Sequence, residues 1–470
     1  MTAFAFPARA KAFPGLWRLL AALAPERQFL LVAGLAGLIL AALIPPLGGG
    51  NERFNFQRTA MVATGRIGIE PLDVPGGVPK LLAANRAQFS EGRAPPYRYT
   101  GAQLGELAAI ALDAGHPAVL QPNPIAILNP VAYLPQTFAY KIGEAFGLPP
   151  LMLFYLGRLA GLAAGLALTF FAIREMPVRA RSLAILAMLP TILFSRATLD
   201  ADQVTNGLAF LFVAVALKAA LGDKALTWRR IALLIALGFF EAQCKTAYMV
   251  LLPLALAIPA ARYGSRLRWA LASAAIILPG LALSLAWMVS LKHGYFAGMT
   301  YTTWAGTVDP DRQAAMILAD PLGYVGVALR TVFDLGFLSQ TLVSFIGIFG
   351  PPVTLPAPLL ALTFAAAAAG LASEGGGSAP KALKSLALGT FFAGTGLVLT
   401  LLYVQWTGLG GPVILGFQGR YLYPLAPAML LWLPQAPLRA AGLAAGDWQL
   451  ALGLVSSGGV LWLTAATYWL

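Results

Sequence analysis

Long apolar stretches alternate with short polar ones along almost the whole chain. An apolar run of roughly 20 residues is long enough to cross a hydrocarbon core about 30 Å thick. The runs that the pattern assigns to single crossings are 29–47, 151–173, 182–194, 203–221, 269–291, 355–372, 385–404, 421–433 and 449–470. The pattern therefore predicts an all-α integral membrane protein that crosses the bilayer many times.

The run 231–259 is different because a polar group, Glu241 to Lys245, interrupts it. Two short helices that turn back at this break would keep the basic residues after it inside, as the positive-inside rule favours. We expect such a pair to line an interior cavity, since non-helical backbone is tolerated there. Counting both halves gives a bundle of about 11 transmembrane helices. Glu241 and Lys245, spaced i, i+4, are expected to form an ion pair.

Polar segments between the runs divide the chain into parts. The divisions are 1–47, a cytoplasmic amphipathic segment with the first transmembrane helix; 48–149, a cap on the outer face with interfacial helices; 150–291, a transmembrane bundle with the short broken pair; 292–354, a second outer segment; and 355–470, the C-terminal transmembrane helices with a Gln-Gly-Arg-Tyr outer loop. Arg9, Lys11, Arg18 and Arg27 precede the first run. The charge rule therefore places the N-terminus in the cytoplasm and the cap in the periplasm.

Composition narrows the functional classes. Only 11% of the residues are charged, against about 25% in soluble domains. The net charge of +13 is spread over the loops, which favours attraction to anionic lipid or to phosphate-bearing substrates over binding to nucleic acid. The single cysteine, Cys244, excludes an internal disulfide and a multi-cysteine metal site.

Ionisable side chains gather where three apolar runs reach the outer face. The clusters are Asn51-Glu52-Arg53; Arg196, Asp200 and Asp202; and Gln418-Gly419-Arg420-Tyr421. Ionisable groups near membrane depth are costly and so are candidates for function; the alternative is that they pair with each other and face water. Glu52 follows a helix break made by two prolines and three glycines. We expect it to be the reactive carboxylate of a membrane-embedded enzyme.

Short motifs in a fixed order resemble those of a family of bacterial integral membrane proteins, domain of unknown function 2142 (DUF2142), grouped with the GT-C glycosyltransferase superfamily. The motifs are Asn51-Glu52; Asn129-Pro130 with Tyr133-Leu134-Pro135; Arg158-Leu159; Ser195 to Asp202; Ile346 to Gly350 with Leu355-Pro356; and Gln418-Gly419-Arg420-Tyr421 with Pro424. The resemblance implies a GT-C-like bundle in the bacterial inner membrane. It also implies an enzyme that takes a sugar from a polyprenyl-phosphate carrier on the outer face.

The first outer loop departs from the superfamily's pattern. GT-C enzymes usually carry an acidic residue, often a pair, in this loop, and here the pair reads Asn51-Glu52. The resemblance therefore implies that Glu52 acts alone as the catalytic base of an inverting transfer. Substrate-binding residues expected on the same grounds are Asn51, Tyr133, Arg158, Arg196, Asp202, Gln418, Arg420 and Tyr421. The arginines would meet the charge that grows on the departing phosphate.

The expected partners are a polyprenyl-phosphate-linked sugar donor, a glycan or lipid acceptor of the cell envelope, and membrane lipids. No cofactor is certain, and the Asp-x-Asp spacing of Asp200 and Asp202 leaves a divalent metal open. Two other functions remain: a transporter or flippase of lipid-linked oligosaccharides, and a glycan polymerase or ligase that uses a polyprenyl-pyrophosphate carrier. The transferase hypothesis predicts that Glu52 and Arg420 line one outward-facing cavity.

Overall fold

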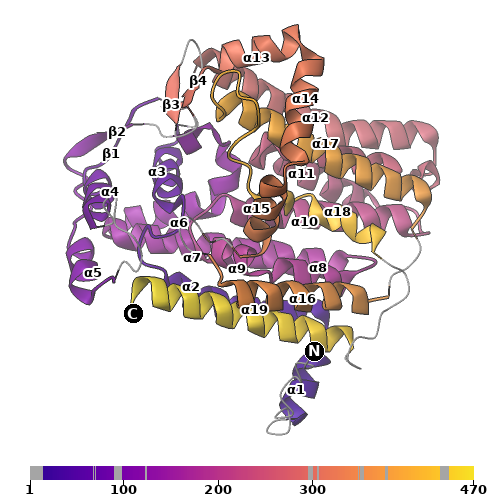
Figure 1. The fold of residues 1–470 in the computed structure, drawn as a ribbon, viewed down its shortest axis with the longest axis horizontal. Coiled ribbons are helices and arrows are strands. Elements are labelled where there is room, and N and C mark those ends of the chain that lie inside the picture. The colour runs from indigo at the N-terminus through magenta and orange to yellow at the C-terminus, as the bar shows by residue number, and fades with distance from the viewer. Residues whose placement is uncertain are drawn as a thin grey trace.

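The fold is known from a computed structural model that describes most of the chain. The described residues are 14–66, 68, 70–88, 98–121, 124–294, 300–303, 306–347, 349, 354–375, 379–433 and 444–470. The basic residues Arg9 and Lys11, and Ile348 and Gly350 of the family motif, lie outside them. The structure is mostly helical, as expected of a helical membrane protein, with two small two-stranded sheets that the sequence did not predict (Figure 1).

Six helices are long and apolar enough to cross a membrane, and each coincides with a predicted crossing. They are α2 (Pro25–Leu43), α7 (Pro150–Glu175), α10 (Asp202–Leu221), α12 (Arg266–Gly294), α17 (Lys381–Gln405) and α19 (Ala445–Tyr468). Two bent pairs also qualify when each pair is taken together: α8 (Ala180–Ala187) with α9 (Pro190–Ala197), and α13 (Pro310–Ala319) with α14 (Pro321–Val332). The described residues thus hold six to eight candidate spans.

The expected number of about 11 crossings is not confirmed. The predicted run 355–372 forms a shorter helix, α16 (Ala357–Ser373). The run 421–433 is irregular, with η5 (Gly419–Leu422), α18 (Ala426–Met429) and η6 (Leu430–Trp432). Pro424 and Pro427 account for this, because a proline lacks the N–H that a continuous helix needs.

The interrupted run 231–259 forms two helices, α11 (Trp228–Cys244) and η3 (Thr246–Ala257), which separate at Lys245. The backbone N–H of Leu226, before the pair, donates to the carbonyl of Arg262, after it, over 2.8 Å. Both ends of the pair therefore lie side by side, as in a chain that turns back. The expected ion pair is wrong: Lys245 pairs with Asp202 instead, and both carboxylate oxygens of Glu241 lack a hydrogen-bond partner among the described residues.

The bundle has two chemically different ends. One, here called the basic end, carries basic residues in the segments 18–27, 174–181, 218–230, 262–268 and 381–384. The other, the site end, is where α2 and α19 finish, with Tyr468 donating to the carbonyl of Gly48 over 2.9 Å. Between them α10 is the central helix, with 83% of its apolar stretch buried. Among the candidate spans α12 is the most exposed, because only 22% of its apolar stretch is buried.

A small cap covers one side of the site end (Figure 1). Its elements are α3 (Glu52–Ala63), β1 (Leu72–Pro75), α4 (Gly77–Gln88), α5 (Gly101–Ala108), β2 (Pro117–Leu120), η1 (Pro124–Ile127), η2 (Pro130–Tyr133) and α6 (Leu134–Ala145). Strands β1 and β2 pair antiparallel, with Leu72 opposite Leu120. Phe56 and Tyr140 of the cap pack with Phe154 of α7, which fixes the cap to the bundle.

The remaining elements complete both ends. They are α1 (Pro14–Ala21), η4 (Ala260–Tyr263), β3 (Tyr301–Thr303), β4 (Gly306–Val308) and α15 (Leu335–Ile346). Strands β3 and β4 pair antiparallel near α13. Helix α15 packs against η5, so it supports the Gln-Gly-Arg-Tyr loop.

The turned-back pair makes a prediction about topology. In a Cys244→Ser background, single cysteines in place of Lys224 and Arg266 are expected to react with a membrane-impermeant maleimide from the same side. A cysteine in place of Lys292, at the other end of α12, is expected to react from the opposite side. Labelling of positions 224 and 266 from opposite sides would mean that the run crosses the membrane once.

Candidate functional site

The three predicted clusters meet at one turn, Thr198 to Asp202, between α9 and α10. The backbone N–H of Leu199 donates to Glu52 over 2.7 Å. The next residue, Asp200, and then Asp202 face Arg420 of the Gln-Gly-Arg-Tyr loop. This turn is therefore the common support of all three, with Glu52 on one side and Arg420 on the other.

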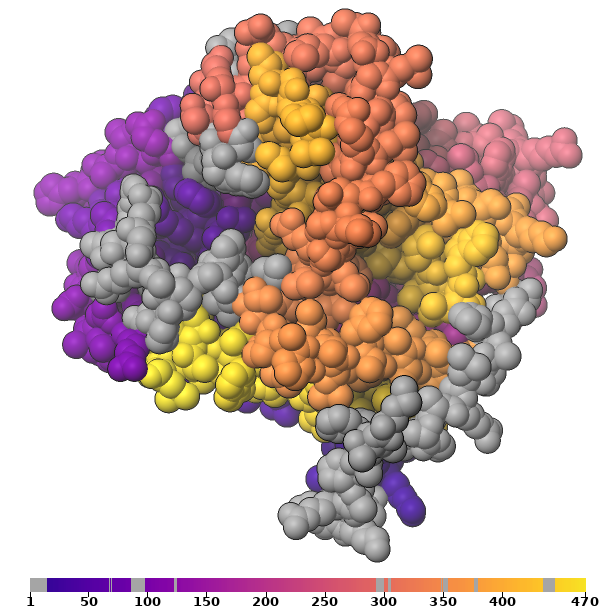
Figure 2. Space-filling view, in the orientation of Figure 1, coloured from indigo at the N-terminus to yellow at the C-terminus, as the bar shows by residue number. Residues whose placement is uncertain are grey.

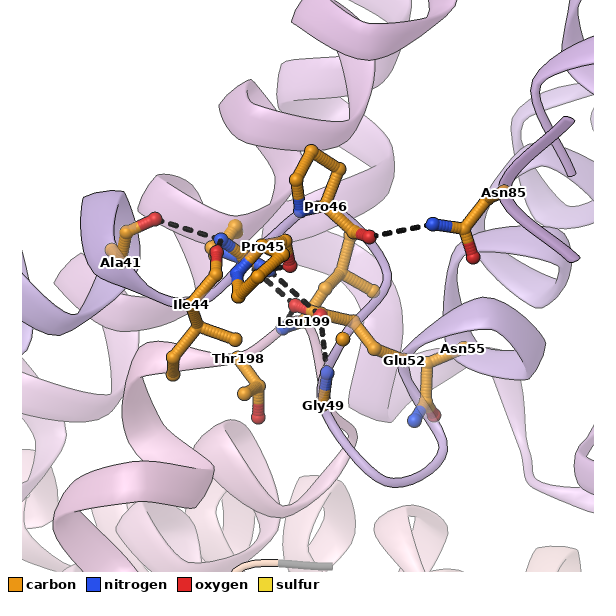
Figure 3. A network of polar contacts seen from close by, with 12 residues as sticks. Ala41, Ile44, Pro45, Pro46, Gly49, Glu52, Asn55, Asn85, Thr198 and Leu199 are labelled. Atoms are coloured by element: carbon orange, nitrogen blue, oxygen red, sulfur yellow. Dashed lines mark hydrogen bonds and ion pairs between the residues drawn. The ribbon is translucent and has the colours of Figure 1, made fainter. Parts of the chain in front are cut away.

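Glu52, the first residue of α3, is saturated with hydrogen bonds (Figure 3). Its Oε1 accepts from Arg158 Nε at 2.8 Å and from Leu199 N at 2.7 Å. Its Oε2 accepts from Arg158 Nη2 at 2.7 Å and from Gly49 N at 3.0 Å. The residue is 1% exposed. A carboxylate offers about four lone-pair sites, so no site is left for a substrate proton in this arrangement.

Arg158 completes the same network from α7. Besides its two bonds to Glu52, it donates from Nη1 to the carbonyls of Ala41 and Ile44 and from Nη2 to that of Pro45, at 2.7, 2.9 and 3.1 Å. All five N–H donors of the guanidinium thereby have partners. The side chain is fully buried and lies over the ring of Phe154. Arg158 therefore closes the end of α2 and is not placed to bind a phosphate.

A second group of charges lies on the other side of the turn. This four-charge cluster consists of Asp200, Asp202, Lys245 and Arg420. Lys245 forms an ion pair with Asp202. Arg420 Nη1 lies 3.6 Å from Asp200 Oδ2 and 3.8 Å from Asp202 Oδ2. The side chains of Lys245 and Arg420 are 19% and 21% exposed, so a ligand can reach this cluster more readily than it can reach Glu52.

The contacts of Arg420 leave binding capacity free. Distances of 3.6 and 3.8 Å to the two carboxylates are longer than a direct hydrogen bond of about 2.7–3.2 Å. Its Nε has no hydrogen-bond partner among the described residues. The planar guanidinium fork matches the geometry of phosphate oxygens. Arg420 is thus suited to bind an anionic group through Nη1, whose contacts with the two carboxylates are long.

The two carboxylates of the cluster have different surroundings. Lys245 holds Asp202, whereas the carboxylate of Asp200 accepts a hydrogen bond from the backbone N–H of Asp202, at 3.1 Å. Burial, with the negative charge of Asp202 beside it, raises the pKa of Asp200, and Arg420 and Lys245 oppose that shift. A carboxylate with a raised pKa is the better proton acceptor of the two.

Hydrogen bonds to α15 and η3 fix the Gln-Gly-Arg-Tyr loop in place. The backbone N–H of Gly419 donates to Ser344 Oγ over 2.7 Å, and Tyr248 donates to the carbonyl of Tyr421 over 3.0 Å. A Cβ at position 419 would lie 2.1 Å from the carbonyl oxygen of Thr341 and 2.4 Å from the nitrogen of Phe345. Only glycine allows this approach, which places Arg420 beside the two aspartates.

Other predicted residues lie near the turn in supporting positions. Tyr133 is fully buried and donates to Asn55 Oδ1 over 2.7 Å. Asn51 accepts from Asn55 Nδ2 through its carbonyl, at 3.0 Å. Gln418 accepts from the backbone N–H of Tyr421, also at 3.0 Å. The ring of Tyr421 lies 5.6 Å from Arg420 Cζ and 5.9 Å from Lys245 Nζ, at the edge of the cluster.

Arg196 does not join the others. Its Nη1 donates to the carbonyl of Ala187 at 3.0 Å and its Nη2 to Thr169 Oγ1 at 3.3 Å, inside the bundle. The expectation that it faces a lipid phosphate is wrong, because its guanidinium is buried and is held by α7 and α8. The sequence also missed Lys245. Its signal in the sequence is the polar break in the apolar run 231–259, where the i, i+4 spacing instead predicts an ion pair between Lys245 and Glu241.

Glu52 and Arg420 do not line one open cavity. They flank the same turn, but Glu52 is sealed while Arg420 is partly exposed. The described residues contain no group of three or more His, Cys, Asp or Glu side chains that could hold a metal ion. Lys245 and Arg420 already balance the negative charges of the two aspartates.

The chain was compared with known proteins. A family model described as a predicted membrane protein (DUF2142) matches residues 34–429. No curated protein and no solved structure matches the chain. The family match covers most of the first apolar run, the cap, the turn and the Gln-Gly-Arg-Tyr loop, so every charged residue of the site falls within it.

The buried pair predicts how Glu52→Gln behaves. The substitution leaves Arg158 buried with its charge unpaired, which is expected to lower the free energy of unfolding by about 3–5 kcal/mol. Chemical denaturation in detergent measures this loss, and Glu70→Gln, at an exposed glutamate between α3 and β1, is the matched control. Unchanged stability combined with lost turnover would instead make Glu52 the proton acceptor.

The close approach of Gly419 predicts that Gly419→Ala displaces the loop. Overpacking of this kind costs about 1–3 kcal/mol, and the resulting shift moves Arg420 away from the aspartates. Thermal unfolding in detergent measures the loss of stability. Gly396→Ala in α17 is the control, since a Cβ there meets nothing within 4 Å. Equal stability of the two variants would contradict the packing described.

Proposed function

We propose that this chain, which belongs to the DUF2142 family of predicted membrane proteins, is a glycosyltransferase of the GT-C type. It moves a sugar from a polyprenyl-phosphate carrier to a glycan or lipid acceptor of the cell envelope, with inversion. The observation that carries the proposal is the four-charge cluster: two carboxylates and two cations, partly exposed, at the end of an apolar bundle. Such a cluster combines an acceptor for a proton with donors for a phosphate.

In the proposed donor complex the phosphate lies against Arg420 and Lys245. Both cations lie beside Asp202, so both can contact one phosphate bound there. The carrier's hydrocarbon tail needs an apolar path. Leu335, Leu338 and Leu342 of α15 are exposed, and α15 lies directly beside the loop that holds Arg420. Helices α14 and α15 run over the face drawn in Figure 2, where the tail can follow them.

The proposed reaction is a single displacement. The acceptor hydroxyl attacks the anomeric carbon from the face opposite the phosphate and gives its proton to Asp200. The bond between that carbon and the phosphate oxygen breaks, and its electron pair stays on the oxygen. Arg420 and Lys245 stabilise the added negative charge on the carrier phosphate. One new glycosidic bond forms, one sugar–phosphate bond breaks, and the configuration inverts.

This assignment gives Glu52 a different role from the one expected from the sequence. One of its four hydrogen bonds holds the backbone of Leu199, the residue before Asp200. Glu52 and Arg158 therefore position the turn that carries the base. Tyr421 keeps its expected role beside the sugar, at the edge of the cluster.

The proposed location is the bacterial inner membrane, with the cluster facing the outside. The charge rule assigns the basic end to the cytoplasm. The site end, where the four-charge cluster lies, then faces the periplasm or exterior. Donors carried on an outward-facing lipid phosphate would reach the cluster without crossing the membrane.

The base assignment predicts that Asp200→Asn strongly reduces turnover with little effect on folding. The expected loss of transfer is about 10²–10⁴-fold, the usual contribution of a general base. The assay is transfer of labelled sugar from a defined polyprenyl-phosphate donor by purified protein. Asp223→Asn, an exposed aspartate at the basic end, is the control. Full transfer by Asp200→Asn would exclude Asp200 as the base, and no transfer by the intact protein from any such donor would overturn the function.

The pH profile of the same assay tests the base independently. A base works when deprotonated, so turnover is expected to fall as pH drops through the pKa of Asp200. Burial raises that pKa above the ordinary aspartate value of about 3.9, so the acid limb should lie above that value. The residual activity of Asp200→Asn should lack this limb; persistence of the limb would assign it to another group.

A further inference from the structure

We propose that a groove on the outside of α12, at the basic end, binds one anionic glycerophospholipid of the surrounding leaflet. The groove is built from two adjoining depressions of about 520 and 270 Å³. Leu256 of η3 and Trp269 and Ala270 of α12 line both of them. It lies at the opposite end of the bundle from the four-charge cluster, and it does not depend on the proposed transferase function.

The lining changes from charged to apolar along the groove. Arg266, the first residue of α12, borders the larger depression, and Ile277 and Leu278 border the smaller one. Twelve residues of α-helix separate Arg266 from Leu278, a rise of about 18 Å. A charged mouth followed by an apolar channel parallel to a membrane-spanning helix matches a phosphate headgroup with an acyl chain below it.

One buried polar atom inside the groove lacks a partner. Ser273 lines the smaller depression and is 3% exposed, and its Oγ makes no hydrogen bond within the described residues. A buried hydroxyl without a partner is costly. Ser273 lies seven residues beyond Arg266, about 10 Å along the helix. An ester carbonyl of a lipid whose phosphate contacts Arg266 can accept this hydroxyl's hydrogen bond.

The charges around the mouth select a negative headgroup. Arg266 at the mouth is exposed, and so is Arg268 two residues farther along α12. Basic pockets between transmembrane helices at this face are typical binding sites for anionic lipid headgroups. Trp269 beside them is a residue type that prefers the membrane–water interface. A neutral lipid would fill the channel but leave the arginines without a counter-charge.

The lipid-facing position of α12 supports this occupant over a protein partner. Its apolar window is only 22% buried, the lowest value among the candidate spans. Leu267, Leu271 and Leu278 are exposed on the same helix. These side chains are compatible with hydrocarbon on both sides of the groove.

The test uses the purified full-length protein after delipidation in detergent. Phosphatidylglycerol and phosphatidylcholine with identical acyl chains are added separately, and bound lipid is counted by native mass spectrometry. We expect tighter binding of one phosphatidylglycerol. Arg266→Gln is expected to weaken it about fivefold, the factor for one basic residue at an anionic lipid surface, and to leave phosphatidylcholine binding unchanged.

Two further variants separate a built site from general charge attraction. Lys381→Gln removes an exposed charge at the same end, outside the groove, and should leave phosphatidylglycerol binding intact. Ser273→Ala should weaken binding of both lipids without lowering the lipid-free unfolding temperature, because it removes a buried hydroxyl that lacks a partner there. Equal binding of the two lipids by the intact protein, an equal loss in Lys381→Gln, or a second copy of the chain in place of lipid would each overturn the proposal.

Discussion

A proline at the end of α2 leaves a backbone carbonyl without its hydrogen-bond donor, and the rest of the site depends on how that donor is replaced. The carbonyl of Ala41 would accept a hydrogen bond from the N–H four residues later, but that residue is Pro45, which has none. The guanidinium of Arg158 supplies the missing donor and reaches Ile44 and Pro45 as well. Because a buried guanidinium needs a counter-charge, Glu52 follows as its partner. That partner in turn holds the backbone of Leu199, so a local defect in one helix fixes the position of a turn far away in sequence.

The same logic separates two kinds of charged residue at the site end. In the Glu52–Arg158 pair every donor and acceptor is used, and neither side chain is exposed. In the four-charge cluster the contacts of Arg420 are long and one of its nitrogens has no hydrogen-bond partner among the described residues. A pair with all its hydrogen bonds made stabilises the fold, whereas a charge with long contacts loses little when it exchanges them for a ligand. Proximity to the membrane boundary alone does not distinguish these two cases.

Hydropathy predicted the six long helices because length and apolar content are local properties that a sequence carries directly. It also located the Lys245 break and the three polar clusters. It could not predict which charges pair. Glu241 is the natural partner of Lys245 on a helix surface, yet Asp202, 43 positions away in sequence, takes that place. The inward direction of Arg196 and the four bonds on Glu52 likewise depend on tertiary packing, which no local pattern encodes.

The unequal lengths of α11 and η3 have a consequence for how Lys245 is held. Helix α11 has 17 residues and η3 has 12, but a 3₁₀-helix rises about 2.0 Å per residue against 1.5 Å in an α-helix. The two limbs therefore span nearly the same height, about 26 and 24 Å, which lets Leu226 meet Arg262 at the foot of the pair. Pro253 lies within η3. As an α-helix, η3 would be shorter by about 6 Å. Either the hydrogen bond between Leu226 and Arg262 would then break, or Lys245 would move toward the basic end. The larger rise per residue of the 3₁₀-helix η3 thus sets the position along the bundle at which Lys245 contacts Asp202.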